Sequence, residues 1–159
     1  MYNIAEDLLE ALRATPEVLE ALLDGCTQEQ ATMARGGDEG WSVVEVICHL
    51  RDAEEEALSR MLLMRDNTHP MIVAYDQELW ARERKYHEAS LREVLAAFNR
   101  FRVQHVTELA QLSPQEWERS GQHEEQGSIT ISSHTLHIVC HDALHAAQIA
   151  RQLKSVASS

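Results

Sequence analysis

Apolar residues recur every three or four positions along four long segments of the chain, residues 3–24, 42–65, 90–112 and 130–154. This spacing places the apolar side chains on one face of a helix, so it predicts an amphipathic helix in each segment. No segment shows a convincing alternation of apolar and polar residues that would indicate a strand. We therefore expect an all-α fold, and four helices of this length are typical of a four-helix bundle.

Local signals indicate where these helices begin and where they are disturbed. Ser42-Val-Val-Glu45 and Ser90-Leu-Arg-Glu93 have the pattern of capping boxes, which predicts helix starts at these two serines. Pro16 follows Thr15 inside the first segment and predicts a kink or a short break there.

The connections between helices are long for a simple up-and-down bundle. Residues 71–89 give no clear pattern, Ser113-Pro114 predicts a short turn of helix, and residues 121–127 are interpreted as a polar loop. We expect crossovers, or loops that cover one end of the bundle, within a single domain that spans residues 1–159.

The charge of the chain limits its partners. Acidic residues number 26 against 14 basic ones, which gives a net charge of −12. Such a surface repels phosphate backbones and anionic lipid headgroups, so we expect neither nucleic acid nor a membrane as partner. We see no apolar run long enough to span a membrane and no secretory signal. Three cysteines without paired spacing indicate reduced thiols and a cytoplasmic protein.

The most informative motif is the pair His141 and His145 in the last helical segment. Histidines four positions apart lie one turn apart on the same helix face, so both rings can reach one metal ion. At about 100° per residue, the same stripe also carries His134, His137 and Gln148. The opposite side carries Leu136, Val139, Ala143, Ala147 and Ala150, which predicts a central place for this helix in the packing.

A third histidine, His49, lies on a polar stripe of the second helical segment together with Glu45, Asp52 and Glu56. We hypothesise that His49, His141 and His145 meet at one metal ion. Neutral imidazoles suit Zn, Ni or Fe, and three protein ligands leave positions open for water or substrate. The alternative is that these histidines are hydrogen-bonded core residues.

The other polar residues have less specific interpretations. Asp52, Glu56 and His137 are candidates for orienting the metal ligands, with a surface or salt-bridging role as the alternative. His134 is interpreted as solvated or as a further support of the ligands. We interpret four histidines as surface residues, namely His69, His87, His105 and His123. Cys48 and Cys140 each precede a proposed ligand and are expected to be buried as small apolar residues.

Taken together, these residues resemble the DinB-like (DinB/YfiT) family of four-helix-bundle proteins. The resemblance rests on Trp41-Ser42, on His49-Leu50 with Asp52, and on His141-Asp142 followed by His145-Ala-Ala-Gln148-Ile149. It covers nearly the whole chain in the order and spacing of its elements. In this family a histidine of the second helix and a pair from the last helix bind a divalent metal, which implies His49, His141 and His145 as the ligands here.

The known activities of the family imply thiol chemistry, and we expect a small-molecule substrate. Some members are similar to S-transferases that use bacillithiol, mycothiol or glutathione, and others carry the label of metal-dependent hydrolases. Our first hypothesis is thiol transfer, with Zn, Ni, Fe or Mn binding a low-molecular-weight thiol as its thiolate. The alternatives are hydrolysis, with Glu56 or Asp52 as general base, and a non-catalytic protein stabilised by its metal.

The apolar residues of the third helical segment suggest self-association. Leu91, Val94, Leu95, Phe98 and Phe101 exceed what a bundle of this size needs for its core. An exposed apolar patch usually marks an interface, so we predict a homodimer. The alternative is that these five residues fill the core of one chain.

Overall fold

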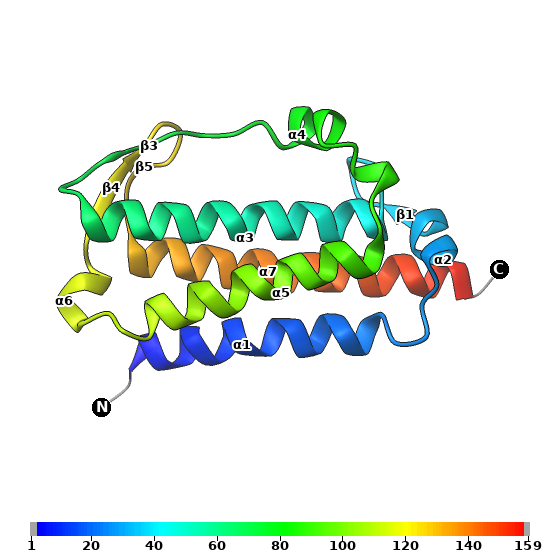
Figure 1. Ribbon diagram of the computed structural model, residues 1–159, viewed down its shortest axis with the longest axis horizontal. Helices are drawn as coiled ribbons and strands as arrows, with labels where there is room; N and C mark the ends of the chain where they lie inside the picture. The colour runs from blue at the N-terminus through cyan, green and yellow to red at the C-terminus, as the bar shows by residue number, and fades with distance from the viewer. Residues whose placement is uncertain (1–2, 158–159) are drawn as a thin grey trace.

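The structure, a computed structural model, describes residues 3–157 and consists mainly of four long helices. These are α1 (Ile4–Leu22), α3 (Val43–Asp66), α5 (Leu91–Leu109) and α7 (Ile131–Ala157). They lie side by side as a bundle (Figure 1). The predicted all-α four-helix bundle is therefore confirmed.

The helices are not connected in simple up-and-down order. α1 and α7 run in one direction, and α3 and α5 run in the other (Figure 1). α5 and α7 each pack against both α1 and α3. The consecutive helices α1 and α3 therefore lie on one diagonal of the bundle, so the chain crosses over between them, as the long connections predicted.

Short elements occupy all three connections. The first contains α2 (Gln28–Met33), β1 (Arg35–Gly36) and β2 (Trp41–Ser42). The second contains β3 (Met71–Ile72), α4 (Gln77–Glu83) and the 3-10 helix η1 (Tyr86–Glu88). The third contains α6 (Pro114–Trp117), β4 (Ser120–His123) and β5 (Gly127–Thr130). The second connection runs back alongside α3 before α5 begins (Figure 1).

The expectation that the chain lacks strands was wrong for these short segments. β1 pairs antiparallel with β2, while β4 pairs parallel with β3 and antiparallel with β5. Strands of two to four residues are too short to show a repeating pattern. Residues 121–127, predicted as a polar loop, belong to a hairpin in which Gly121 and His123 are buried.

The predicted helix starts are confirmed. The side chain of Ser42 accepts a hydrogen bond from the backbone nitrogen of Glu45, and that of Ser90 accepts one from Glu93. These bonds satisfy amide groups that the first turn of a helix leaves unpaired. The short helix predicted at Ser113-Pro114 is also present, as α6.

Pro16 does not break the first helix, because α1 continues through it. Proline has no backbone N–H, so the carbonyl four residues earlier, that of Leu12, loses its helical partner. Arg102 of α5 replaces it, since its Nη1 donates to the Leu12 oxygen at 2.8 Å. A guanidinium from a neighbouring helix thus satisfies the acceptor that the proline leaves free.

Two expectations about packing need correction. Leu136, Ala143 and Ala147 of α7 are exposed, so the apolar flank of this helix does not lie at the centre of the packing. In α5, Leu91, Val94, Leu95 and Phe98 are buried, and Phe101 is half-buried. These residues fill the core of a single chain. They therefore do not form the exposed apolar patch on which the homodimer prediction was based.

Candidate metal centre

His49 of α3 and the pair His141 and His145 of α7 meet between these two helices. The Nε2 atoms of His49 and His141 lie 2.8 Å apart. One ligand nitrogen from each of the three rings can be chosen so that all lie within 4.8 Å of one another. The ring centroids of His141 and His145 are 4.4 Å apart, as expected for a pair one helical turn apart. The three histidines predicted from the sequence as metal ligands thus lie close together in the structure.

Burial keeps two of these rings neutral. Loss of solvent around His49, followed by the charge of His145, lowers its pKa to about 4. The same effect of burial, with His49 and His145 nearby, lowers the pKa of His141 to about 2. A neutral imidazole keeps a lone pair for a cation, whereas an imidazolium has none.

Gln148 orients the third ring. Nδ1 of His145 lies 2.9 Å from Oε1 of Gln148. Because an amide oxygen cannot donate, this bond places the ring proton on Nδ1 and leaves the lone pair of Nε2 free. Metal-binding histidines commonly bond an oxygen in this way. The sequence placed Gln148 on the histidine stripe but gave no indication of this bond.

The donor set of the triad fits a divalent cation that favours nitrogen ligands. Three imidazoles converge, burial holds two of them neutral, and a hydrogen bond fixes the tautomer of the third. The other nitrogen of His49, Nδ1, is buried and has no hydrogen-bond partner within residues 3–157. Zn, Ni, Fe and Mn all accept such ligands, so the triad alone does not select among them.

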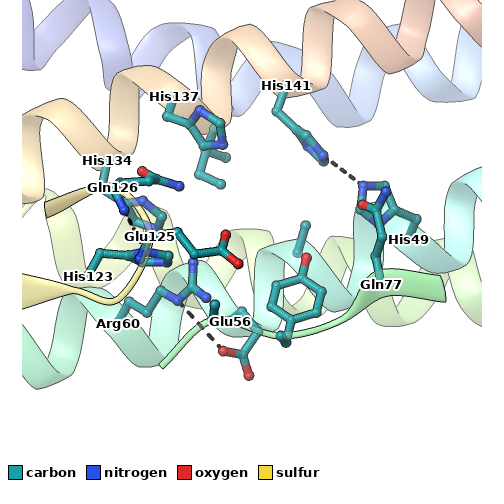
Figure 2. A pocket seen from close by; sticks show the side chains of 14 residues that line it. His49, Glu56, Arg60, Gln77, His123, Glu125, Gln126, His134, His137 and His141 are labelled. Carbon is teal, nitrogen blue, oxygen red and sulfur yellow. Dashed lines mark hydrogen bonds and ion pairs between the residues drawn. The ribbon is translucent and has the colours of Figure 1, made fainter. Parts of the chain in front are cut away.

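The triad borders a cleft of about 390 Å³ between α3 and α7. Its wall is completed by Tyr75 before α4, by Gln77 at the start of α4, and by Glu125 and Gln126 of the β4–β5 turn. Figure 2 shows His49 and His141 at one end of this cleft and His123, His134 and Arg60 toward the other. The histidines are therefore accessible from an open space rather than sealed inside the bundle.

A second cavity, of about 540 Å³, borders the triad at His145. The loop of Gly36 and Gly37 and the α7 residues Gln148 and Arg151 contribute to its wall. The triad thus contributes to the walls of two spaces, His49 and His141 to one and His145 to the other.

Asp52 does not line either cavity but is fully buried beside His49 on α3. Its Oδ1 accepts a hydrogen bond from Arg51 at 2.8 Å, and its Oδ2 pairs with Arg84 at 3.0 Å. The hydroxyl of Tyr86 also donates to Oδ2. The carboxylate of Asp52 therefore anchors the connection between α3 and α5 to α3. This corresponds to the salt-bridging interpretation.

Glu56 and His137, the two other candidates near the triad, both line the first cleft. The Oε2 of Glu56 lies 3.8 Å from Nε of Arg60, and the side chain of Glu56 is 30% exposed. The exposed ring of His137 lies 6.2 Å from that of His141, measured between centroids. His134, one turn further from the triad, is buried in the cleft wall.

Of the four histidines predicted at the surface, His69 and His87 are exposed, but His105 and His123 are buried. Nδ1 of His105 lies 2.8 Å from Oε1 of Glu54, a partner 51 positions away that no local pattern indicates. The prediction for Cys48 is confirmed, whereas Cys140 is exposed, contrary to expectation.

Arg102 lies at the centre of a buried ion cluster that the sequence did not indicate. Its Nη2 lies 2.8 Å from Oε2 of Glu54 and 2.8 Å from Oδ2 of Asp142. The hydroxyl of Thr15 also donates to that Asp142 oxygen, at 2.9 Å. Because Asp142 follows His141 directly, this cluster connects α1, α3 and α5 to the helix that carries two of the three triad histidines.

A family model matches most of the chain, over residues 11–149, and describes the DinB superfamily. The chain belongs to the DinB superfamily. This confirms the resemblance found in the sequence. No helix among residues 3–157 combines the length and the apolar character needed to cross a membrane.

Two relatives within curated proteins are similar to this DinB-superfamily chain. A protein of Oceanobacillus iheyensis is 33% identical over 150 residues, which cover 92% of this chain and 80% of that protein. A protein of Geobacillus thermodenitrificans is 29% identical over 119 residues, covering 72% and 66%. Both carry the name "putative metal-dependent hydrolase".

A solved structure has the same fold. YfiT from Bacillus subtilis aligns with a TM-score of 0.87 and 23% identity, covering 95% of this chain and 86% of that one. It is described as "a probable metal-dependent hydrolase with an unusual four-helix bundle topology".

Proposed function

We propose that this protein is a hydrolase of a small-molecule substrate that depends on one divalent metal ion held by His49, His141 and His145. The observation that carries the proposal is the position of the triad, which borders an open cleft of about 390 Å³ that also contains the carboxylate of Glu56. The names of the two relatives support the same class of reaction.

The ion and the chain have separate tasks in this proposal. A divalent ion held by imidazoles acts as a Lewis acid and lowers the pKa of water that it coordinates. Glu56 accepts the proton of the attacking water at its carboxylate and returns it to the leaving group. The guanidinium of Arg60, 3.8 Å from Oε2 of Glu56, limits the orientations that this carboxylate adopts.

Glu56 is a better candidate for this role than Asp52. Both oxygens of Asp52 are already paired, with Arg51 on one side and Arg84 on the other. A carboxylate that accepts a proton would lose these ion pairs, and Asp52 is fully buried away from the cleft. Glu56 lines the cleft and remains partly exposed.

The substitution Glu56→Gln tests the proposal with metal-loaded protein and a panel of chromogenic esters and amides. We expect kcat to fall about 10²- to 10⁴-fold, the range for loss of a general base, while the metal content stays unchanged. Glu55→Gln, one position earlier in α3 and absent from the cleft wall, is the matched control. Equal turnover by the Glu56→Gln variant and the wild type would rule out this role for Glu56.

Thiol transfer is the second candidate, and the second cavity favours it. This space of about 540 Å³ borders His145, whereas the first cleft borders His49 and His141. Two reactants could therefore approach one ion from different spaces, with a low-molecular-weight thiol in one and its electrophile in the other. Hydrolysis needs only one of these spaces for an organic substrate.

The two reactions are separated by their dependence on a thiol. Metal-loaded protein is incubated with monochlorobimane, with and without bacillithiol, mycothiol or glutathione. Turnover that requires one of these thiols supports transfer. Hydrolytic turnover of the ester or amide panel, together with no thiol-dependent reaction, supports hydrolysis and contradicts transfer.

A further inference from the structure

The end of the first cleft away from the triad is rich in hydrogen-bond donors. It is formed by Arg60 of α3, His123 of β4 and His134 of α7 (Figure 2). His134 precedes His141 by seven residues of the same helix, a distance of about 10 Å along the axis. A ligand at this end would thus be separated from the triad by roughly the length of a small metabolite.

His123 presents a donor to this space. Its Nδ1 accepts hydrogen bonds from the backbone nitrogens of Glu125 and Gln126, at 3.2 and 3.3 Å. Burial, together with the charge of Arg60, lowers the pKa of the ring, so it is neutral and its single proton lies on Nε2. This residue is 2% exposed, and its Nε2 has no hydrogen-bond partner among residues 3–157.

Arg60 supplies a permanent positive charge in a fixed position. Its Nη2 donates to the carbonyl oxygen of Val73 at 3.0 Å, and its guanidinium carbon lies 5.6 Å from the centre of the Tyr75 ring. The Nε atom is buried and has no hydrogen-bond partner within the described chain, because Oε2 of Glu56, its ion-pair partner, lies 3.8 Å away. A buried donor without a hydrogen bond is costly, so an acceptor bound closer to Nε would lower the free energy of this region.

His134 adds a neutral ring to the same wall. Burial, followed by the charge of Arg60, lowers its pKa to about 3. Its Nε2 is buried and also lacks a hydrogen-bond partner within residues 3–157. The ring therefore adds hydrogen-bonding capacity and no positive charge that would compete with Arg60.

Two carboxylates oppose an anion at this end of the cleft. Glu56 lies 3.8 Å from Arg60, and Glu125 lines the same wall. Arg60 is the only lysine or arginine among the residues that line this cleft within the described chain. Any anion bound there must therefore depend on Arg60, and removal of either carboxylate should strengthen its binding.

We propose that Arg60 and His123, with His134 beside them, bind a carboxylate or phosphate group of the substrate. The guanidinium provides charged donors, and Nε2 of His123 provides a neutral one, a combination that suits the oxygens of such an anion. This inference rests on the proposed function for its other end, where the reacting group meets the triad. It defines the substrate as a small molecule with an anionic group at the end of the cleft opposite the triad.

Titration of metal-free protein with inorganic phosphate, and separately with acetate at equal ionic strength, tests this site. The ring-proton resonances of His123 and His134 report binding by nuclear magnetic resonance. Arg60→Gln should weaken the preferred anion about 10- to 100-fold, the loss expected for a charge-assisted hydrogen bond. Arg65→Gln, on the same helix but outside the cleft wall, is the matched control and should bind as the wild type does.

Two further variants are expected to strengthen anion binding, a result that misfolding of the protein would not produce. Glu56→Gln and Glu125→Gln should tighten binding about two- to fivefold, because each removes a repulsive charge. His141→Ala should leave anion binding unchanged. The anion site is therefore tested independently of the proposed metal-dependent reaction. Unchanged affinity in Arg60→Gln, no gain in both glutamine variants, or loss of binding in His141→Ala would overturn the proposal.

Discussion

At the scale of single residues, the hydrogen bond between His145 and Gln148 determines whether the Nε2 lone pair of His145 is free to bind an ion. We predict that Gln148→Ala weakens metal binding about 10- to 100-fold, because the ring loses the oxygen that holds its proton on Nδ1. Competition with a chromogenic chelator measures the affinity. Gln104→Ala, at an exposed position of α5, is the control. Equal affinities of the Gln148→Ala variant and the wild type would contradict this role.

The protonation of Glu54 makes the stability of the protein depend on pH. Burial alone would raise its pKa, but hydrogen bonds from His105 and Arg102 and the charge of Arg102 lower it from 4.5 to about 2. The unfolded chain therefore binds this proton more readily than the folded one. The stabilising contribution is complete above pH 4.5 and is lost as the pH falls from 4.5 toward 2.

Urea unfolding over this acid range measures the effect of Glu54. The wild type should lose stability as the pH falls, and Glu54→Gln should lack this component because it has no carboxylate to protonate. Glu55→Gln should retain the wild-type dependence. An identical slope in Glu54→Gln and the wild type would show that another group is responsible.

Single residues also show how far the sequence could predict the site. His141 and His145 were selected because helical periodicity places them on one face, and His49 because it lies on a polar stripe of another helical segment. The family resemblance implies the same three residues. His105 and His123 were misplaced because their surroundings come from elsewhere in the chain. His105 contacts Glu54, and His123 lies on β4, which pairs with β3 at Ile72. No sequence pattern indicated a role for Arg60, because the cleft wall depends on the path of the connection between α3 and α5.

At the scale of elements, Arg102 connects the proline-containing α1 to the rest of the bundle. It pairs with Glu54 of α3 and Asp142 of α7, and it donates to the Leu12 carbonyl that Pro16 leaves free. Arg102→Ala would leave two buried carboxylates and this carbonyl without their partner. We predict a loss of about 3–5 kcal/mol in the free energy of unfolding, the usual cost of breaking a buried ion pair.

Chemical denaturation of Arg102→Ala and of Arg100→Ala measures this difference. Arg100 is exposed two positions earlier in α5, so its removal should change the stability by less than about 0.5 kcal/mol. A similarly small effect of both substitutions would show that the buried cluster contributes little to stability.

The long helices could be predicted because their signals are local. Their periodicity lies within each segment, and the caps at Ser42 and Ser90 involve residues three positions apart. The break expected at Pro16 is absent because Arg102, from another helix, replaces the missing interaction. The short strands could not be predicted for the same reason: β3 pairs with β4 across about 50 positions of sequence, and neither has a pattern of its own.

At the scale of the whole molecule, the crossover topology produces the cleft. The connection between α3 and α5 returns along α3, and the β4–β5 turn meets its first part, so both contribute to the wall beside the histidines. Ala74 donates its backbone N–H to Glu124 at 2.8 Å, which joins the two segments. A simple up-and-down bundle with tight turns would lack this wall.

Self-association stays a prediction at this scale. The apolar residues of α5 that suggested it are in the core, but Leu136 and Leu144 of α7 are 46% and 71% exposed. We still expect a homodimer, and light scattering at micromolar concentration measures it. A mass of twice 18.0 kDa would support the prediction, and a mass near 18.0 kDa would contradict it.

Metal analysis of protein purified without a nickel column tests whether His49, His141 and His145 hold an ion. After incubation with Zn, Ni, Fe or Mn and removal of excess ion, we expect about one ion per chain in the wild type. His141→Ala should retain little metal, while His137→Ala, one turn away on the same face, should retain it. Circular dichroism confirms that each variant is folded. Equally little metal in the wild type and in His141→Ala under these conditions would show that the triad is not a metal site.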